Sequence, residues 1–265
     1  MADPASDKPA STDGDFERRF GGLRRLYGAE GAQRIFDAHV LVVGIGGVGS
    51  WAAEALARSG VSRLSLVDLD HVAESNINRQ IHASDVTLGM SKVLAMRERV
   101  MGYHPTCVVD AVDAFVEPEN WTALLDGIGH RPDAVIDACD QVRAKTAMAA
   151  WAQRAQTTLV TVGAAGGKRL AHAVEVRDLA EVTHDPLLAQ LRYRLRKHHG
   201  ARREGRMGWT CVFSREAVVQ PDASCVADGG DGSLNCHGYG STVSVTATFG
   251  LCAAGEVLNR LAEKK

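Results

Sequence analysis

Short apolar runs alternate with segments of helical patterning along the first two thirds of the chain. The runs of strand length cover residues 39–43, 64–67, 108–115, 134–136 and 158–162. The helical segments between them cover residues 47–59, 90–101 and 142–155. Strands that alternate with helices favour right-handed crossovers, so the pattern predicts an α/β fold, a mainly parallel sheet with helices on both faces.

The N-terminal part has a different pattern. Residues 1–14 hold no apolar run, which predicts a disordered, solvated tail without a signal peptide. A charged segment at 16–36 follows, and its apolar residues recur at helical spacing. We therefore expect a helix directly before the first strand.

The C-terminal part loses the regular alternation after residue 163. Residues 173–176 favour a strand, and Asp185 followed by Pro186 marks the start of a helix. We interpret this part as an extension of the same fold. The predicted organisation is a single domain over residues 15–265, with a core over about 38–165 and a C-terminal elaboration over about 166–265.

Residues 238–255 carry no charge and could be mistaken for a membrane span. A spanning helix needs roughly 20 mostly apolar residues, whereas this segment contains several Ser, Thr and Gly. Its small residues favour close helix packing. We therefore predict a buried or subunit-interface helix and no stable membrane span.

Composition narrows the class of protein. Apolar residues make up 45% and charged residues 23% of the chain, which excludes a wholly disordered protein. The formal net charge of −2 excludes a strongly basic protein but leaves a local basic patch open. None of the six cysteines is spaced as CxxC, which disfavours a compact zinc site and fits free thiols in a reducing cytoplasm.

A glycine-rich loop at residues 44–49 (GIGGVG) follows the first predicted strand directly and opens a helix. Its glycines allow a tight turn and close approach of the backbone to phosphate, while the helix N-terminus offers free amides. Asp68 ends the next strand, where a carboxylate can accept hydrogen bonds from ribose hydroxyls. These features predict a Rossmann-like nucleotide-binding fold. The glycines expected to bind the nucleotide are Gly44, Gly46, Gly47 and Gly49.

The nucleotide could be NAD or ATP, and the residues after the second strand distinguish the two. Asn76 and Arg79 lie in the segment SNINRQ, and Lys92 follows. A dehydrogenase does not need cations here. An enzyme that cleaves ATP uses guanidinium and ammonium groups to neutralise the phosphates and the departing pyrophosphate. The sequence therefore favours ATP over a plain NAD-dependent oxidoreductase.

The loop GIGGVGS, the segments LVDLD and SNINRQ, and Lys92 together resemble the ubiquitin-activating enzyme superfamily, in its small bacterial adenylating branch. The segments RRFGG, RLYG, NRQIHA, CVFSREA and VTATFG resemble the tRNA threonylcarbamoyladenosine dehydratases within it. The resemblance runs from about Arg18 to the C-terminus. Sulfur-carrier adenylating relatives usually carry two zinc-binding CxxC pairs, which this chain lacks, so the dehydratase branch is favoured.

The resemblance implies roles for individual residues. Asp68 would bind the ribose of ATP, and Asn76 would contact the phosphates. Arg79 and Lys92 would contact the phosphates and act in catalysis. Asp140 would lie beside a magnesium ion and the α-phosphate, as a metal ligand and catalytic residue.

The resemblance also implies a partner subunit. Arg19 resembles an arginine that the neighbouring subunit inserts into the nucleotide site, which implies a homodimer. ATP and magnesium would be the cofactors, and tRNA the macromolecular partner. The compartment would be the cytoplasm.

The implied reaction is an ATP-dependent dehydration of N6-threonylcarbamoyladenosine in the tRNA anticodon loop. Its threonyl carboxylate would be adenylated, and the carbamoyl group would then close a ring and release AMP. This route requires no protein nucleophile. Cys236 lies in a glycine-rich loop beside His237 and is a candidate nucleophile, with a purely structural loop cysteine as the alternative.

A basic segment at residues 192–206 is a candidate RNA contact, because a local cluster suffices to attract phosphates. The alternative is a solvated helix face. The candidate contacts are Arg192, Arg196, Lys197, Arg202, Arg203 and Arg206.

Two other functions remain open from the residues. The first is an adenylyltransferase that activates the C-terminus of a sulfur-carrier or ubiquitin-like protein. It would need a docking groove for a Gly-Gly tail, which the basic segment does not offer. The second is a nucleotide-binding protein that serves in a sulfur-transfer relay, with Cys236 as the acceptor and a relay protein as partner.

Overall fold

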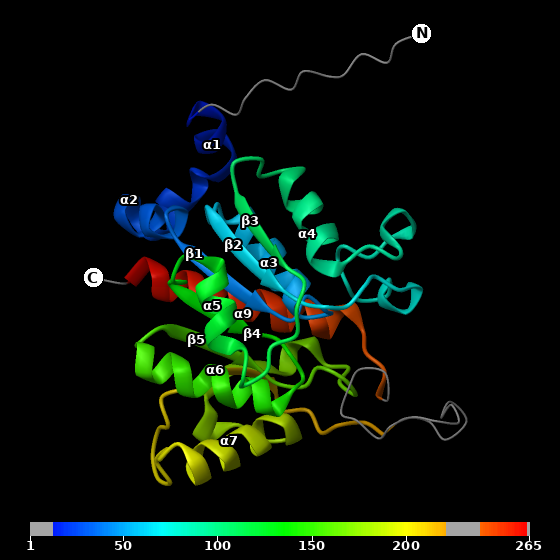
Figure 1. Ribbon diagram of the computed structural model, residues 1–265, viewed down its shortest axis with the longest axis vertical. Coiled ribbons are helices and arrows are strands. Elements are labelled where there is room, and N and C mark those ends of the chain that lie inside the picture. The colour runs from blue at the N-terminus through cyan, green and yellow to red at the C-terminus, as the bar shows by residue number, and fades with distance from the viewer. Residues whose placement is uncertain (1–12, 221–238, 264–265) are drawn as a thin grey trace.

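The structure is a computed structural model that describes residues 13–220 and 239–263. In this part of the chain, seven strands form one sheet in the order β3-β2-β1-β4-β5-β7-β6 (Figure 1). All neighbouring strands are parallel except β6 and β7. The predicted mainly parallel sheet is confirmed. The strands are β1 (His39–Val43), β2 (Arg63–Val67), β3 (Val108–Val112), β4 (Ala134–Asp137), β5 (Thr158–Val162), β6 (Val174–Asp178) and β7 (Thr210–Ser214).

Helices cover both faces of the sheet, as predicted. One apolar core lies under α2, α3, α4 and α9, and the other under α5, α6 and α7. Successive side chains of β1 alternate between them, with Val40 and Val42 in the first core and Leu41 and Val43 in the second. The helices are α1 (Asp13–Phe20), α2 (Gly22–Phe36), α3 (Gly49–Arg58), α4 (Lys92–Met101), α5 (Trp121–Ile128), α6 (Val142–Ala155), α7 (Pro186–His198) and α9 (Val243–Glu263), with 3-10 turns η1 (Glu74–Asn76), η2 (Asp85–Thr87), η3 (Ala171–Ala173) and η4 (Leu179–Glu181).

The N-terminal region differs from the prediction in two ways. The single helix expected at 16–36 is two helices, and α2 is itself kinked at Gly28, whose φ of 73° is left-handed. Helix α1 already begins at Asp13, so the last two residues of the predicted tail are helical. Residues 1–12 lie outside the described part of the chain.

Several other boundaries can be compared. The strand expected at 108–115 ends at Val112. The predicted start of α7 is confirmed, because the Asp185 carboxylate accepts a hydrogen bond from the Leu188 amide at 2.9 Å. The sequence analysis missed α5 and β7. Strands β6 and β7 extend the sheet beyond β5, so part of the C-terminal elaboration continues the core.

Helix α9 forms the predicted buried helix of the uncharged segment. Val245, Phe249 and Ala253 are fully buried, and the helix packs along α3. Within residues 13–220 and 239–263, no helix is both long enough and apolar enough to cross a membrane. A Cβ atom at Gly250 would lie 2.4 Å from the Val48 carbonyl oxygen, so the two helices approach at a glycine.

This contact yields a stability test within α9. We expect G250A to lower the free energy of unfolding by about 1–3 kcal/mol, because the added methyl group meets backbone atoms. The control is G255A, whose Cβ would meet nothing within 4 Å. That variant should gain roughly 0.5–1 kcal/mol from helix propensity. Urea denaturation measures the free energy of unfolding of both variants. Equal stabilities of G250A and G255A would contradict the close packing of α9 against α3.

Candidate active site

A cavity of about 640 Å³ opens at the carboxyl ends of the central strands. The sheet order reverses between β1 and β4, which is the switch point where open α/β sheets bind their ligands. Of the residues predicted to bind the nucleotide, those that line the cavity are Gly44, Gly46, Gly47, Asp68, Asn76, Arg79, Lys92 and Asp140. Distant segments of the sequence therefore meet around one cavity, and of the four predicted glycines only Gly49 is not among its lining residues.

The glycine loop passes close to the turn after β4. Gly44 has a φ of 86°, and a Cβ atom there would lie 2.9 Å from the Ala138 carbonyl group. Gly49 begins α3 behind the cavity wall, where a Cβ would lie 1.7 Å from the Gly44 carbonyl oxygen. The loop therefore needs glycine at both positions, and its backbone forms one wall of the cavity.

Asp68 holds the glycine loop in addition to lining the cavity. Its Oδ2 accepts a hydrogen bond from the Ile45 amide at 2.6 Å, and its Oδ1 accepts one from the Asp70 amide at 2.8 Å. Burial raises the pKa of Asp68, while Lys92 and the two amides oppose that rise. A carboxylate at this place can serve the ribose and the loop together.

Two buried cations face the cavity. Lys92 Nζ lies 2.7 Å from Asp70 Oδ2, and Arg79 Nη1 donates to Asn78 Oδ1 at 2.8 Å. Asn76 accepts a hydrogen bond from the Ala73 amide at 3.0 Å and so shapes the turn that carries Arg79. The cavity thus carries an ammonium and a guanidinium group, the two side-chain cations that commonly bind phosphates.

The turn after β4 rests on a buried ion pair that the sequence analysis did not find. Lys145 of α6 and Asp137 of β4 are fully buried, and Lys145 Nζ lies 3.0 Å from Asp137 Oδ1 and 2.7 Å from the Val162 carbonyl oxygen. Thr161 Oγ1 donates to Asp137 Oδ2 at 2.6 Å. Burial disfavours the charge on Lys145, but Asp137 outweighs it and holds the pKa of Lys145 above its ordinary value.

Cys139 lies on this turn and lines the cavity. Its thiol donates to Asp137 Oδ1 at 3.1 Å. Burial and the Asp137 carboxylate raise the pKa of Cys139 well above its ordinary value, so the thiolate is scarce. The arrangement does not favour a nucleophile. Cys236, the nucleophile candidate from the sequence, lies outside the described residues.

The cavity has further lining residues that the sequence analysis did not assign. Gln80 belongs to the SNINRQ segment, so its position could have been inferred from that motif. Arg143 follows Asp140 by three residues, at the start of α6. Thr246 comes from α9 and shows no local sequence signal. Each adds a polar group to the wall.

Arg19 lies elsewhere within its own chain. Its Nη1 donates to the Tyr103 carbonyl oxygen at 2.7 Å, beyond the end of α4. The residues that line the cavity do not include it in the described part of this chain. Arg19 therefore lies outside the candidate nucleotide site of its own chain.

The basic segment divides into two groups. Arg192 donates to the Leu179 and Val182 carbonyl oxygens, and Arg196 donates to those of Arg202 and Arg203. These two side chains hold the fold of the segment. Its exposed cations are Lys197, Arg202, Arg203 and Arg206. Lys197 lies in the last turn of α7, and the three arginines follow that helix. Because α7 begins at the cavity and its 13 residues extend roughly 20 Å, these cations lie far from the site.

The buried ion pair yields a test of how the site is held. We expect K145M to cost about 3–5 kcal/mol of stability, because it leaves the Asp137 carboxylate buried without its partner. The double variant D137N/K145M removes that charge and should recover part of the loss. Chemical denaturation of the three proteins decides, and a K145M protein as stable as the parent would contradict this role.

Comparisons with known proteins agree with this geometry. The sequence profile of the ThiF family matches residues 21–265. The chain is 43% identical over 258 residues to the tRNA threonylcarbamoyladenosine dehydratase of Escherichia coli K12, which covers 94% of this chain and 95% of the relative. It is 38% identical over 256 residues to the enzyme of that name from Haemophilus influenzae, with coverages of 95% and 96%.

Solved structures show the same likeness. The E. coli dehydratase in complex with ATP superimposes with a TM-score of 0.83 at 42% identity, over 95% of this chain and 96% of that one. Its complex with AMP gives a TM-score of 0.82, over 96% and 97% of the two chains. The chain therefore belongs to the ThiF family and, within it, groups with the tRNA threonylcarbamoyladenosine dehydratases.

Proposed function

We propose that this protein is an ATP-dependent tRNA threonylcarbamoyladenosine dehydratase. The observation that carries the proposal is the cavity at the switch point, where the glycine loop faces the buried cations Arg79 and Lys92. The relative of the same name from E. coli, 43% identical, has been solved with ATP and with AMP. Both nucleotides are the ones that an adenylating dehydration consumes and releases.

The chemistry follows from the leaving groups. An oxygen of a carboxylate leaves poorly, so it is first transferred to phosphorus. The threonyl carboxylate oxygen bonds to the α-phosphorus of ATP, the bond to the bridging oxygen breaks, and pyrophosphate carries away the charge. The carbamoyl group then attacks the activated carbonyl carbon, the ring closes, and AMP leaves with the former carboxylate oxygen. Because the second step is intramolecular, positioning supplies much of its rate.

The residues of the cavity have separate parts in this reaction. Lys92 and Arg79 would neutralise the phosphates and the departing pyrophosphate. Asp68 would hold the ribose and the glycine loop, and Asn76 would fix the turn that presents Arg79. The fixed backbone of the glycine loop would orient the α-phosphate for attack.

A magnesium ion would bind at this site together with the nucleotide, whose phosphates would supply some of its ligands. Among the described residues, no three His, Cys, Asp or Glu side chains gather so that they could hold a metal ion on their own. Magnesium commonly takes one or two carboxylates together with substrate phosphates and water. Asp140, which lines the cavity, would supply such a carboxylate. The ion would screen the charge of the phosphates.

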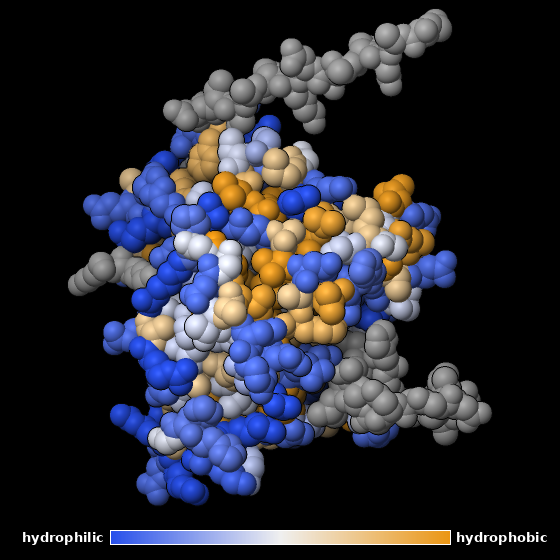
Figure 2. Space-filling model, viewed as in Figure 1, coloured by the Kyte–Doolittle hydropathy of each residue, from blue (hydrophilic) through white to orange (hydrophobic). Residues whose placement is uncertain are grey.

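We further propose that the protein works as a homodimer. Leu94 and Met101 of α4, Val108 of β3 and Phe115 are 37–56% exposed. Figure 2 shows an apolar area at the centre of this face, where Figure 1, in the same view, places β3 and α4, and β3 is an edge strand of the sheet. An exposed apolar face on an edge strand favours a covering partner. A second copy of the chain there is supported by Arg19, which hydrogen-bonds next to this face and needs a second copy to reach a nucleotide.

The alternative, an adenylyltransferase for a sulfur-carrier protein, has weaker support. The molybdopterin-synthase adenylyltransferase of Salmonella typhimurium is 36% identical over 139 residues, which are only 52% of this chain. A sulfur-relay partner would act through Cys236, outside the described residues. Since tRNA is the proposed substrate, we expect the enzyme to act in the cytoplasm.

The central test is mass spectrometry of nucleosides from tRNA incubated with the protein, ATP and magnesium. We expect an ATP-dependent loss of one water from the threonylcarbamoyl nucleoside. R79A and K92A should each slow this loss by about 100-fold or more, because a group that stabilises charge in the transition state is removed. K92R keeps the charge and should retain more activity than K92A.

Two results would contradict these proposals. An unchanged nucleoside mass, combined with pyrophosphate release when a Gly-Gly-tailed carrier protein is added, would replace the dehydratase by the adenylyltransferase. Full activity of K92A would contradict the phosphate contact assigned to Lys92.

Mixing two inactive variants tests the dimer. R19A keeps an intact cavity but lacks the arginine that would enter the site of the partner subunit. K92A has a defective cavity but keeps Arg19. If Arg19 acts on the partner subunit, an equal mixture that exchanges subunits should regain about a quarter of parental activity, since half of its dimers hold one complete site. If the mixture stays as inactive as each variant, Arg19 does not act across the interface.

A further inference from the structure

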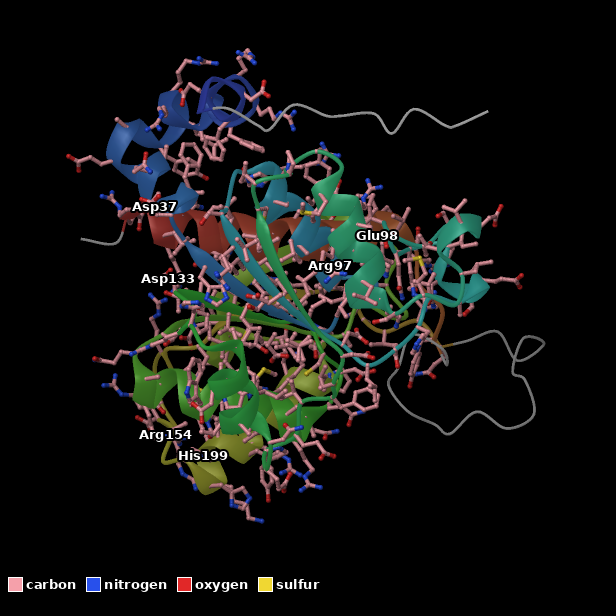
Figure 3. All side chains as sticks on the ribbon, turned by 45° about the horizontal axis from the view of Figure 1, so that its top comes forward. Asp37, Arg97, Glu98, Asp133, Arg154 and His199 are labelled. Atoms are coloured by element: carbon pink, nitrogen blue, oxygen red, sulfur yellow. The ribbon has the colours of Figure 1, made fainter. Side chains whose placement is uncertain are left out.

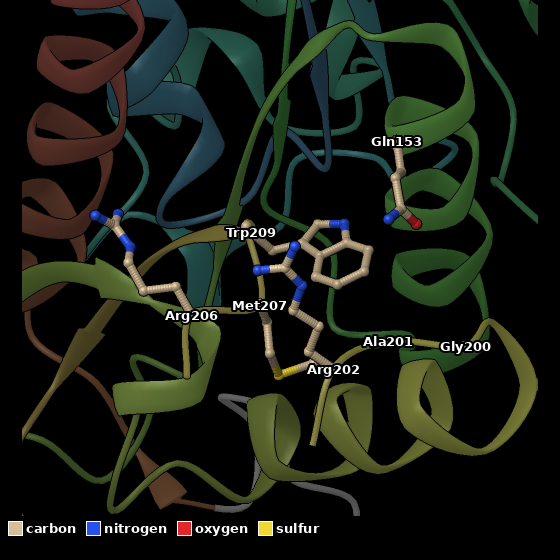
Figure 4. A pocket seen from close by; sticks show the side chains of 8 residues that line it. Gln153, Gly200, Ala201, Arg202, Arg206, Met207 and Trp209 are labelled. Atoms are coloured by element: carbon tan, nitrogen blue, oxygen red, sulfur yellow. The ribbon is translucent and has the colours of Figure 1, made fainter. Parts of the chain in front are cut away.

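A second cavity, of about 390 Å³, lies at the opposite edge of the sheet from the candidate active site. It is formed where α6 and α7 end and where the chain enters β7 (Figure 4). We name it the distal pocket. Its principal lining residues are Gln153, Ala201, Arg202, Arg206, Met207 and Trp209.

The distal pocket is positively charged at its mouth. Arg202 and Arg206 are exposed, and Arg206 Nε is 4.0 Å from the nearest carboxylate oxygen, that of Asp178. That carboxylate already accepts hydrogen bonds from the amides of Met207 and Gly208, at 2.8 and 2.7 Å. The two guanidinium groups therefore keep donors for an anion from outside.

Two further cations, Arg154 and Lys197, belong to the ends of α6 and α7 at which the pocket is formed. Arg154, near the end of α6, lies close to His199, which follows α7 (Figure 3). Burial and the Arg154 charge lower the pKa of His199, so this imidazole adds little positive charge and the attraction comes from the arginines and Lys197. Lys197 is exposed on the same end of α7. An anion would therefore be attracted from several sides.

The floor of the distal pocket is apolar and fixed in place. Met207 and Trp209 line it and are only 6% and 5% exposed. The indole Nε1 of Trp209 donates to the Ala149 carbonyl oxygen at 3.1 Å, which holds the ring against α6. Apolar and aromatic surfaces beside arginines are the chemistry that receives an unpaired base together with its phosphate.

We propose that the distal pocket binds an unpaired nucleotide of the tRNA whose threonylcarbamoyl base enters the active site. This proposal rests on the proposed function for the identity of the RNA. The volume lies within the range of small-ligand pockets. Arg143 on α6 lines the active-site cavity, and Gln153, ten positions further along the same helix, lines the distal pocket. The rise of the helix therefore separates these two residues by about 15 Å. A single nucleotide cannot occupy both sites, whereas one folded RNA can.

The test measures binding of full-length tRNA to the full-length protein as a function of salt. R202E and R206E should each weaken binding by about tenfold, and each should lower the slope of log K against log salt by about 0.7–0.9, the value of one phosphate contact. Q153W fills the cavity without a change of charge. It should weaken binding with little effect on the slope. R25E, an exposed position on α2, is the matched control and should bind as the parent does, because α2 covers the opposite face of the sheet from α6 and α7.

The outcomes distinguish a nucleotide bound inside the distal pocket from RNA that contacts only the exposed charges around it. If R202E and R206E weaken binding but Q153W does not, only the exposed charges contact RNA, and the proposal is overturned. Unchanged binding by all three variants overturns it as well. ATP affinity reports on folding, and it should match the parent in every variant; if an arginine variant fails this check, Q153W alone decides.

The same experiment separates this proposal from the proposed function. Binding is measured without turnover, so weaker tRNA binding by Q153W supports the distal pocket even if no dehydration occurs. Conversely, if Q153W dehydrates and binds tRNA as the parent does, the proposed function is supported and the nucleotide-binding role of the distal pocket is overturned. Competition by inorganic phosphate alone, with no effect of Q153W on tRNA, would identify a simple anion site and overturn the nucleotide assignment.

Discussion

Two fully buried opposite charges, on Lys145 and Asp137, fix the turn on which the active site is built. Burying such a pair is costly unless hydrogen bonds satisfy the remaining groups, and here Thr161 and the Val162 carbonyl do so. The pair joins the ends of β4 and β5 to α6. The turn from residue 138 to 141 is therefore held rigidly, and Gly44 can approach it at the distance of direct contact.

This rigidity matters because the site acts by electrostatics. Lys92 already contacts Asp70, and Arg79 contacts Asn78 and a backbone carbonyl. A phosphate that enters therefore meets cations in defined positions and exchanges with their present partners. Charges that need little rearrangement stabilise a developing pyrophosphate more than mobile ones would. The fold thus determines the reaction through where it fixes charge.

The sequence analysis succeeded where the signal is local. The segment 39–43 is buried along its whole length. Its four consecutive apolar residues after His39 predicted β1 with the bounds that the structure shows. Asp185 and Pro186 likewise predicted the start of α7. Strand β7 was missed because its burial depends on pairing with β5 and β6, which are distant in sequence.

The analysis of the site shows the same division. The glycine loop was found because it follows β1 directly, and Arg79 and Lys92 were found from their positions in the segment after β2. Lys145 was missed because a lysine within a helix is usually a solvated side chain, and nothing local shows that Asp137 lies beneath it. Arg19 could be assigned only by resemblance, since its proposed contact lies in another copy of the chain. Tertiary and quaternary contacts thus determine the roles that spacing alone leaves open.

Helices α6 and α7 link the active site to the distal pocket, and this link bears on substrate choice. The reacting group is a carboxylate, which many small molecules in a cell also carry. Binding energy from parts of a substrate remote from the chemistry can be used to position the reacting group. Since both helices are rigid elements with one end at each site, the separation of the two sites is constant. Only a substrate that carries an unpaired nucleotide with its phosphate at that separation gains binding energy from both the active site and the distal pocket. By this proposal, the enzyme can select RNA without binding the carboxylate itself tightly.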